Sequence, residues 1–389
     1  MEKLRVGIIG IGNMGSAHCA NLTDKKIPDM TLTAVCDINP KRLEWAEKKY
    51  PDVQRFATSD ELFAAHVCDV IIVATPHYDH PRLVIEGLQK GYHMMCEKPA
   101  GVYTKAVEEM NAVAEKSDKM FGIMFNQRTN PAYIEMKHIV ESGQLGAIKR
   151  TNWIITDWYR SQAYYDSGNW RATWNGEGGG VLLNQCPHNL DLWQWICGMP
   201  VKVQAHLHFG KWHNIEVEDD VTAYVEYANG ATGVFITSTA DAPGDNRFEV
   251  LGTKGKLVCE GNKLTFYRNV VDERDFCFGN TGGFAALKYD TIEYNYTGSE
   301  WGEQHVGVLK AFAGAILRGE KPIADGKEGI NGLTLSNAMH LSAWLGRAVD
   351  LPLDADLYLA ELNKRRAASK KKEEKEAVVL DTTGSYGNK

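Results

Sequence analysis

"LRVGIIGIGNMGSAHCANL" (residues 4–22) joins a short apolar strand pattern to the spacing Gly10-x-Gly12-x-x-Gly15 and a helix-like segment. Gly10 permits a tight turn, Gly12 lets the backbone approach a pyrophosphate, and Gly15 lets helix and strand pack closely. The helix N-terminus then offers free N–H groups and a positive dipole end to phosphates. Because many loops contain this spacing by chance, its meaning depends on the neighbouring sequence.

The next apolar run, "TLTAVCD", ends at Asp37, where a carboxylate accepts hydrogen bonds from an adenosine ribose. That carboxylate repels a 2′-phosphate, so we expect NAD and disfavour NADP, although Lys41 and Arg42 follow closely. The alternative is a flavodoxin-like fold whose glycines serve packing only. Strand and helix patterns alternate up to residue 127, which predicts parallel βαβ units in a doubly wound Rossmann sheet.

Polar residues follow several predicted strands of this first half. In a parallel sheet, ligands bind outside the carboxyl ends of the strands. We therefore expect these residues at one edge of the sheet: Asp37, Thr75-Pro76-His77, Glu97-Lys98-Pro99 and Asn126-Gln127-Arg128.

The pattern changes near Ile148, where strand-like segments succeed one another with Asn-Gly and Lys-Gly turns and few helices. This predicts an α+β domain on a large, mostly antiparallel open sheet. Helix patterns over 301–319 and 326–349 are expected to pack on the first domain or across the sheet. The expected units are a Rossmann domain (1–127), a substrate-binding and oligomerisation domain (128–353), and a charged helix with a tail (354–389).

Composition excludes several classes of protein. Apolar residues make up 44% and charged residues 24% of the chain, and its formal charge of −7 disfavours binding to nucleic acid. No apolar run reaches the ~18 residues of a membrane span, and the early strand pattern leaves no room for a signal peptide. The eight cysteines are scattered without a Cys-x-x-Cys pair, so we expect reduced thiols and a cytoplasmic protein.

A second informative stretch is "GGGVLLNQCPHNLDLWQW" (residues 178–195). On a helix, Asn184, His188 and Asp191 share a face opposite an apolar stripe, and Pro187 kinks the helix or marks where it becomes regular. This face is either solvated or part of a site. Seven of the ten tryptophans lie between Trp153 and Trp212, as core or interface residues or as platforms for a sugar face.

Oxidation of a secondary alcohol requires a group that removes the hydroxyl proton at near-neutral pH, and histidine suits this role. A cation such as Lys98 would stabilise the developing alkoxide, unless it is a surface lysine. A metal site is not expected, because no carboxylate or cysteine completes a ligand spacing around His206, His208 and His213.

The segments "GIIGIGNMG", "ATPHYDH", "CEKP" and "GEGGGVLLNQCPHNLDL", in this order, resemble the Gfo/Idh/MocA oxidoreductase family over roughly residues 4–350. The resemblance implies that Lys98 lies between nicotinamide and substrate and that His188 is the catalytic histidine. Asn184 stands where the family usually has Asp, so it is expected to hydrogen-bond a substrate hydroxyl without acid–base chemistry. Asp191 either supports His188 or is structural.

Residues 157–198 are also similar to the sugar 3-dehydrogenase branch of that family, which includes levoglucosan dehydrogenase and glycoside 3-dehydrogenases. The expected substrate contacts are Asn184, Arg128, Asp157, Tyr159, Tyr165 and Trp174. At least two members of a set that lines the sugar pocket or covers the cofactor are expected to be packing only: Asp157, Tyr159, Tyr165, Trp170, Arg171 and Trp174. The expected cofactor contacts are Gly10, Gly12, Asn13, Met14, Asp37, Thr75, Pro76, His77, His80, Glu97, Lys98, Asn126, Trp170, Arg171 and Gln185.

The resulting hypothesis is NAD-dependent oxidation of a secondary ring hydroxyl, preferably C3, of a sugar or glycoside to the keto sugar. His188 takes the hydroxyl proton, Lys98 holds the oxygen, and the hydride goes to nicotinamide. The alternatives are redox-assisted glycoside cleavage with recycled NAD, oxidation of inositol or another cyclic polyol, and a non-catalytic NAD-binding sensor. A small carbohydrate is the expected partner, without nucleic acid or membrane, and the resemblance implies a homodimer or homotetramer.

Overall fold

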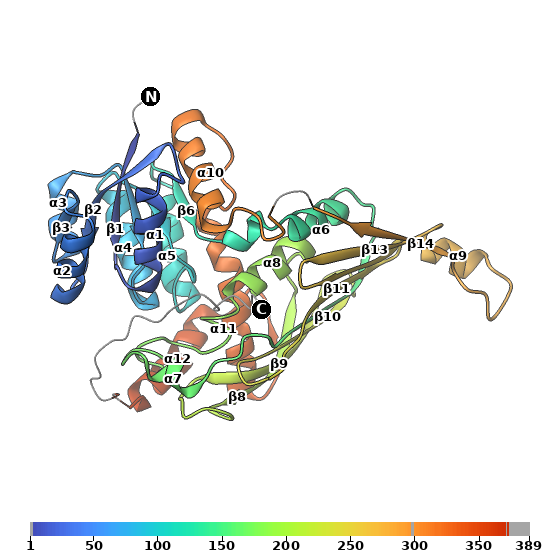
Figure 1. The fold of residues 1–389 in the computed structure, drawn as a ribbon. Helices are drawn as coiled ribbons and strands as arrows, with labels where there is room; N and C mark the ends of the chain where they lie inside the picture. The colour runs from blue at the N-terminus through green and yellow to red at the C-terminus, as the bar shows by residue number, and fades with distance from the viewer. Residues whose placement is uncertain (1–2, 297–298, 371, 373–389) are drawn as a thin grey trace.

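The computed structural model describes residues 3–296, 299–370 and 372, which form two sheets flanked by helices (Figure 1). In the first sheet the strand order is β3-β2-β1-β4-β5-β6, and all neighbouring strands run parallel. This is the doubly wound order of a dinucleotide-binding fold, so the predicted Rossmann sheet is confirmed. The strands are β1 (Leu4–Ile9), β2 (Met30–Cys36), β3 (Gln54–Phe56), β4 (Val70–Val73), β5 (His93–Cys96) and β6 (Phe121–Ile123).

Helices cover both faces of this sheet and begin where the sequence provides caps. Asn39 caps α2 and precedes a proline at the first helical position, while Thr58 and Glu61 form a capping box at α3. The helical segments are α1 (Asn13–Thr23), α2 (Pro40–Lys49), α3 (Ser59–Ala65), η1 (His77–Asp79), α4 (His80–Gln89), α5 (Thr104–Ala114) and η2 (Asn126–Thr129).

The second sheet has the order β14-β13-β12-β11-β7-β10-β9-β8-β15 among the described residues. Only β7 and β10 pair in parallel there, so the mostly antiparallel open sheet is confirmed. The strands are β7 (Ile148–Ile155), β8 (Lys202–Phe209), β9 (Glu218–Glu226), β10 (Thr232–Ser238), β11 (Asn246–Gly252), β12 (Gly255–Glu260), β13 (Lys263–Asn269), β14 (Tyr289–Tyr294) and β15 (Val349–Asp350). The two edge strands β14 and β15 were not predicted from the sequence.

Helices pack on one face of the second sheet. The ring of Trp193 in α8 stacks on Phe235 of β10 with centroids 5.4 Å apart, and Trp153 of β7 stacks on Phe248 of β11 at 4.2 Å. These tryptophans therefore serve the core. The helical segments of the second half are α6 (Pro131–Glu141), α7 (Gln162–Asp166), α8 (Pro187–Cys197), α9 (Glu273–Gly279), α10 (Gln304–Arg318), η3 (Gly326–Glu328), α11 (Gly329–Leu345) and α12 (Ala355–Ala368).

The chain returns to the first sheet after it has built most of the second. Helix α10 lies beside the first domain in Figure 1, and its Leu309 and Phe312 join the core cluster of Val6 and Ile8. Helix α11 instead packs against α8 and β8. Helix α10 thus packs on the first domain, whereas α11 packs across the second sheet and also contacts α5 of the first domain. Within the predicted third segment, α12 spans Ala355–Ala368, and residues 371 and 373–389 lie outside the described residues.

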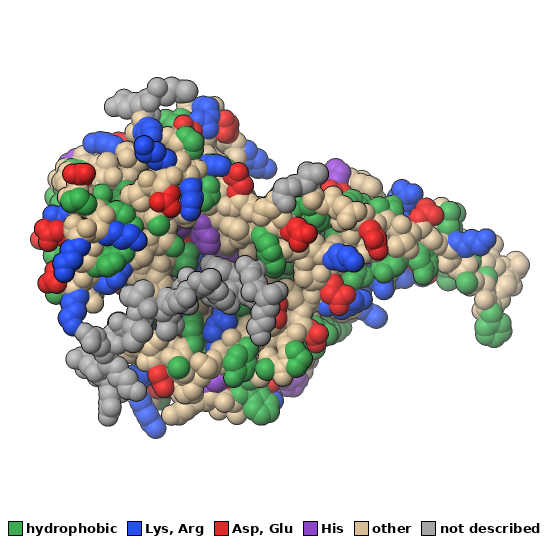
Figure 2. All heavy atoms as spheres, viewed as in Figure 1, with side chains coloured by type: hydrophobic (Ala, Val, Ile, Leu, Met, Phe, Trp, Pro, Cys, Tyr) green, Lys and Arg blue, Asp and Glu red, His purple; other side chains and the backbone are tan. Residues whose placement is uncertain are grey.

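The surface agrees with the balanced composition. Figure 2 shows basic and acidic side chains interspersed over the first domain, without a large patch of one sign. No helix within the described part of the chain is long and apolar enough to cross a membrane. The eight cysteines are free, and all except Cys197 and Cys277 are buried.

Candidate active site

The loop between β1 and α1 has the geometry of a pyrophosphate-binding turn. Gly10 has φ +88°, and a Cβ atom there would lie 2.7 Å from the carbonyl oxygen of Ala74. A Cβ atom on Gly15 would lie 1.9 Å from the carbonyl oxygen of Gly10, whereas one on Gly12 would meet nothing within 4 Å. Gly12 is the N-cap of α1, so the loop presents open backbone at a helix N-terminus that begins with Asn13 and Met14.

Asp37 follows β2 and lies beside this loop. Its carboxylate accepts hydrogen bonds from the N–H groups of Ile11 at 2.9 Å and Asn39 at 2.8 Å. The guanidinium of Arg42 donates to the Ile11 carbonyl at 2.8 Å and to the Ser16 hydroxyl at 2.7 Å. The carboxylate is therefore fixed at the end of β2 beside the glycine loop, and Arg42 is engaged by the protein itself.

The strand ends and the loop before α8 share an unusual set of buried polar atoms. These atoms have no hydrogen-bond partner among the described residues, although such partners are the rule for buried polar groups. They are Thr75 Oγ1, His77 Nδ1, Asn126 Oδ1, Gln185 Oε1 and both ring nitrogens of His188. Each belongs to a residue predicted to contact cofactor or substrate, so the site fits a bound dinucleotide.

Two other predicted cofactor contacts instead hold the backbone of the site. Glu97 accepts a hydrogen bond from His18 Nε2 at 2.7 Å and one from the Lys98 N–H at 3.2 Å. Burial opposes its ionisation, but the hydrogen bond and charge of His18 lower the pKa of Glu97 to about 2. The ring nitrogens of His80 lie 2.7 Å from the Pro99 carbonyl and 2.8 Å from the Thr75 carbonyl. The geometry assigns both side chains to positioning rather than to direct contact.

Lys98 reaches across to the second domain. Its Nζ donates to the main-chain carbonyl of Asn184 at 3.0 Å, which ties the end of β5 to the loop before α8. Burial lowers the pKa of Lys98, while the charges of Glu97 and Glu177 oppose this shift. Lys98 is partly buried and its ammonium is held by the loop before α8, so it is not a freely solvated surface lysine.

His188 lies in the first turn of α8 and is 3% exposed. Its ring meets the edge of Phe125, with the centroids 6.3 Å apart. Burial and the charge of Lys98 lower the pKa of His188 well below its ordinary value. The imidazole is consequently neutral near pH 7 and able to accept a proton.

The loop before α8 corrects one expectation. The helix begins at Pro187, so Asn184 lies in a turn and does not share a helical face with His188. A Cβ atom on Gly180 would lie 1.9 Å from the carbonyl oxygen of Glu218, which shows what the glycine-rich backbone approaches. The buried carboxylate of Glu218 accepts the N–H groups of Gly180 at 2.8 Å and Leu182 at 3.0 Å.

Arg128 and Asp191 form a buried ion pair. Arg128 Nε and Nη2 donate to the two oxygens of Asp191 at 2.8 and 2.7 Å, and both side chains are 1% exposed. Arg128 Nη1 also donates to Glu328 at 2.5 Å. The geometry therefore favours a structural role for Arg128 over the predicted substrate contact, and Asp191 is bound to Arg128 rather than to His188.

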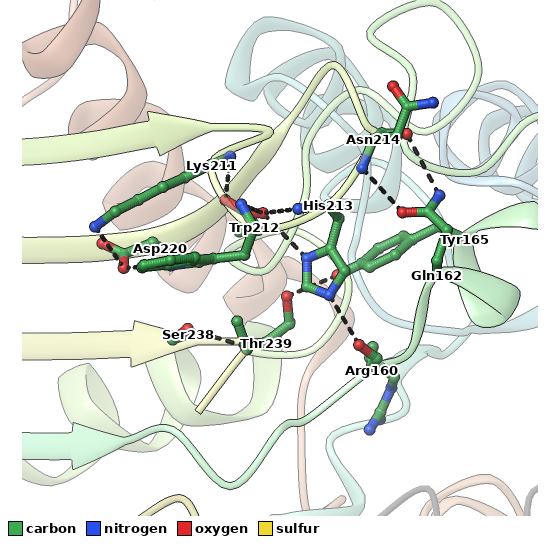
Figure 3. Close-up of polar contacts among 12 residues, drawn as sticks. Arg160, Gln162, Tyr165, Lys211, Trp212, His213, Asn214, Asp220, Ser238 and Thr239 are labelled. Atoms are coloured by element: carbon green, nitrogen blue, oxygen red, sulfur yellow. Dashed lines mark hydrogen bonds and ion pairs between the residues drawn. The ribbon is translucent and has the colours of Figure 1, made fainter. Parts of the chain in front are cut away.

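Tyr165 also has a packing role. Its hydroxyl donates to Thr239 at 2.8 Å, and its ring lies against His213 with centroids 4.9 Å apart (Figure 3). His213 bonds the carboxylate of Asp219 at 3.0 Å and the Arg160 carbonyl at 2.9 Å, so this histidine fastens the segment before α7. In the part of the chain that the structure describes, no three His, Cys, Asp or Glu residues cluster as metal ligands.

Trp174 is buried against the edges of two rings. Its centroid lies 5.8 Å from that of His340 and 5.6 Å from that of Trp344. Its carbonyl accepts the hydroxyl of Tyr78 at 2.7 Å. As with Tyr165, these contacts favour packing over a substrate contact.

A cationic aromatic cluster lies beside His77. The guanidinium of Arg171 lies 4.5 Å from the centroid of Trp170 and 4.6 Å from that of Tyr164. The Tyr164 hydroxyl accepts from Arg171 at 2.9 Å and from Gln185 at 3.2 Å, and the rings of Trp170 and His77 are 5.8 Å apart. The structure thus groups three predicted cofactor contacts, Trp170, Arg171 and Gln185, around a tyrosine that was not predicted to belong to the site.

The remaining predicted substrate contacts follow β7. Tyr159 is exposed, as expected of a residue at a rim. Asp157 is partly buried, and burial raises its pKa to about 6 against the hydrogen bond from Asn246. Both are compatible with substrate contact, although nothing in their packing requires it.

Two buried acids near the site, Glu177 and Glu218, were not predicted from the sequence. Glu177 directly precedes the glycine cluster of residues 178–180 and bonds the side chain of Asn184. Glu218 begins the run Glu218-Asp219-Asp220 at the start of β9, and its exposed fraction is 0%. The sequence signal for Glu218 was the acidic run itself, which stands directly before the apolar pattern of β9. A fully solvated acidic run is not expected at the start of a buried strand.

Comparison with known proteins agrees with this architecture. Residues 4–125 match the model of an oxidoreductase family with an NAD-binding Rossmann fold, and residues 133–258 match the GFO/IDH/MocA C-terminal domain. The myo-inositol 2-dehydrogenase of Thermotoga maritima is 26% identical over 90% of this chain and 98% of its own. The D-glucoside 3-dehydrogenase of Escherichia coli is 27% identical over 59% of this chain and 68% of its own.

Among solved structures, a levoglucosan dehydrogenase in complex with NADH shares the fold, with a TM-score of 0.76 and 21% identity, over 90% of this chain and all of that one. The two sheets, the glycine loop, the partly buried lysine and the buried histidine define an NAD-dependent oxidoreductase. The chain belongs to the Gfo/Idh/MocA family. The resemblance inferred from the sequence is therefore confirmed, and the non-catalytic sensor is set aside.

Proposed function

We propose that this chain oxidises a secondary ring hydroxyl of a sugar or glycoside, with C3 as the preferred position. The observation that carries the proposal is the environment of His188, whose two ring nitrogens are buried without partners among the described residues, close to the charge of Lys98. A buried, neutral and unpaired imidazole near an ammonium group suits removal of a proton from a hydroxyl.

In the proposed reaction, His188 accepts the hydroxyl proton as the alcohol becomes a carbonyl. Lys98 donates a hydrogen bond to the same oxygen and stabilises the negative charge that develops on it. Asn184 contacts a neighbouring hydroxyl of the ring. NAD held by Gly10, Gly12, Asp37 and the ends of β4 and β5 supplies the hydride acceptor.

The resemblance of residues 157–198 to sugar 3-dehydrogenases and the relative named D-glucoside 3-dehydrogenase support C3 as the position. A cyclic polyol is the second candidate substrate, because the longer match is to a protein named myo-inositol 2-dehydrogenase. Both substrates present a ring hydroxyl to the same lysine and histidine.

The test is formation of NADH, followed by absorbance, from NAD and a panel of levoglucosan, glucose, aryl glucosides and myo-inositol. We expect a sugar or glycoside to react, and His188→Ala and Lys98→Ala to lose this activity while still binding NADH. His206→Ala is the matched control, since this histidine is exposed on β8. A product only from myo-inositol would select the polyol. Cleavage of an aryl glucoside without net NADH would indicate the redox-assisted lyase.

We also propose a cytoplasmic homodimer or homotetramer that associates through the open face of the second sheet. Its support is the alternation along β9, where Thr222 and Tyr224 are exposed between the buried Val221, Ala223 and Val225. Light scattering of Tyr224→Lys and wild-type protein tests the assembly. A smaller mass is expected for the variant, and an unchanged mass would reject this face.

A further inference from the structure

Glu177 is a buried carboxylate in contact with the proposed substrate contact Asn184. Its side chain is 2% exposed. One carboxylate oxygen, Oε2, accepts the Ala172 N–H at 2.6 Å, and the other, Oε1, accepts the carboxamide Nδ2 of Asn184. Arg171 Nη1 lies 3.7 Å from Oε1. Both oxygens are therefore held by donors inside the protein.

This contact fixes the orientation of the Asn184 carboxamide. An ionised carboxylate only accepts hydrogen bonds, so the amide must turn its NH₂ group toward Glu177. The oxygen Oδ1 is left over, and among the described residues it has no hydrogen-bond partner. The main-chain carbonyl of the same residue holds the ammonium of Lys98 at 3.0 Å. Asn184 thus links Glu177 to the proposed catalytic lysine.

We propose that Glu177 is the positioning residue of this site: its carboxylate is paired with the carboxamide of Asn184, and it holds that side chain so that Oδ1 accepts a substrate hydroxyl. The second part rests on the proposed function, whereas the pairing of the two side chains does not. Glu177 and Asn184 accordingly form one unit with a single negative charge.

The charged and titratable groups around Glu177 come from several elements. Arg171 approaches from the same loop and Lys98 from the end of β5, while Glu218 acts from β9. The ring of His77, from η1, lies near the main chain of Glu177, and that backbone raises the pKa of His77 against the larger effect of burial. Burial raises the pKa of Glu177, against the charge of Arg171 and the hydrogen bonds from Ala172 and Asn184.

The single negative charge of the Glu177–Asn184 pair can be tested by adding a second one. Asn184→Asp sets a second carboxylate against Glu177 in a buried site. Two carboxylates in contact cannot both ionise without cost, so one must take up a proton. The variant should therefore be less stable than wild type at high pH and recover at low pH. Adding Glu177→Gln removes one of the two charges and should also restore stability.

The experiment compares four full-length proteins: wild type, E177Q, N184D and E177Q/N184D. Thermal unfolding is measured from pH 5.5 to 8.5 without substrate. At pH 8.5 we expect N184D to lose at least ~3 °C in Tm and the double variant to regain most of that loss. The matched control is N175D, an exposed charge in the same loop, which should not be rescued by E177Q. Additive losses at every pH, or rescue of N175D as well, would overturn the proposal.

Activity provides an independent reading once a substrate is known. N184D should lose about tenfold or more in kcat/KM at pH 8.5, and the double variant should recover most of it. If the double variant E177Q/N184D regains Tm but not kcat/KM, the positioning role of Glu177 is rejected, and Glu177 and Asn184 are only a structural pair. If no sugar or polyol reacts in wild type, the proposed function fails, but the coupling in Tm still tests the pair. If NADH forms and the coupling is absent, only the role of Glu177 fails.

Discussion

At the scale of single residues, the chemistry depends on one imidazole that the protein leaves unpaired. Both nitrogens of His188 are buried without partners in the described structure, and burial together with the charge of Lys98 lowers its pKa. The base form must be neutral, so activity persists above the pKa in the folded protein and disappears below it. The ordinary pKa of a histidine side chain is 6.5. We therefore predict that kcat/KM does not change as the pH falls through this value and decreases only at lower pH.

The measurement is a pH profile of kcat/KM for wild type and H206A, with H188A as the inactive reference. We expect H188A to lose about 10²–10⁴-fold in kcat. A fall centred above pH 6.5 that H206A does not alter would contradict the assignment of a buried neutral base.

Residues predicted from motifs proved easier to locate than residues predicted from aromatic or basic character. The glycines, Asp37 and Lys98 lie at the strand ends that their spacing indicated, because a strand end fixes the position of the next few residues. Arg128, Tyr165 and Trp174 turned inward, since each has a buried partner that lies far along the chain, such as Asp191 for Arg128. Sequence spacing contains no information about such partners.

At the scale of elements, Glu97 and His18 connect the end of β5 to α1. The pKa of Glu97 is lowered from 4.5 to about 2, so its ionised form stabilises the fold. That contribution, about 3 kcal/mol, is present above pH 4.5 and is lost as the pH falls through about 2. We predict that E97Q is destabilised by this order of magnitude at pH 7.5 and by about half as much near pH 3.

Urea unfolding at the two pH values checks this prediction, with E115Q, an exposed carboxylate next to α5, as the control. An E97Q penalty that is independent of pH would show that the side chain contributes by packing rather than by its charge.

The ion pair between Arg128 and Asp191 links η2 to α8, the helix that carries His188. Removal of one member leaves a buried charge without a partner, so we predict that R128M lowers the free energy of unfolding by about 3–5 kcal/mol. R128M/D191L should regain much of this loss, because neither charge remains. Urea unfolding measures the stability, and NADH formation measures KM. If R128M/D191L is as stable as wild type but its KM remains higher than that of wild type, Arg128 contacts the substrate.

Element boundaries were the weakest part of the prediction. The periodicity of residues 180–197 suggested one helix, yet α8 begins at Pro187 because the glycine-rich backbone bonds to Glu218 instead. The long strands of both sheets were predicted well, whereas the edge strands β14 and β15 were not. Edge strands have only one neighbour, so their sequences carry a weaker pattern of burial.

At the scale of the whole molecule, the first domain is completed by a helix from the far end of the chain. Phe312 and Leu309 of α10 are fully buried with Val6 and Ile8, although the sequence predicted a Rossmann unit over residues 1–127. We predict that a fragment of residues 1–127 does not fold cooperatively, because it exposes the apolar surface that α10 covers. Circular dichroism during heating checks this, and the full chain is the control. A sharp transition with NADH binding in the fragment would contradict it.

The parallel first sheet and the mostly antiparallel second sheet could be predicted from the strand and helix patterns, since parallel strands require crossovers. The different packing of α10 and α11 could not be predicted, because both are apolar helices of similar length. The identity of the substrate could not be predicted from these residues either, because the same lysine and histidine suit both sugars and cyclic polyols.

The most direct test of the proposed C3 oxidation uses a glycoside substrate deuterated at C3, with the C2-deuterated isomer as its control. The mass of the NADH formed shows where the transferred hydrogen came from. We predict deuterium in NADH and a slower reaction from the C3 isomer only, with both effects requiring His188. Deuterium from the C2 isomer, or unlabelled NADH from both, would contradict oxidation at C3.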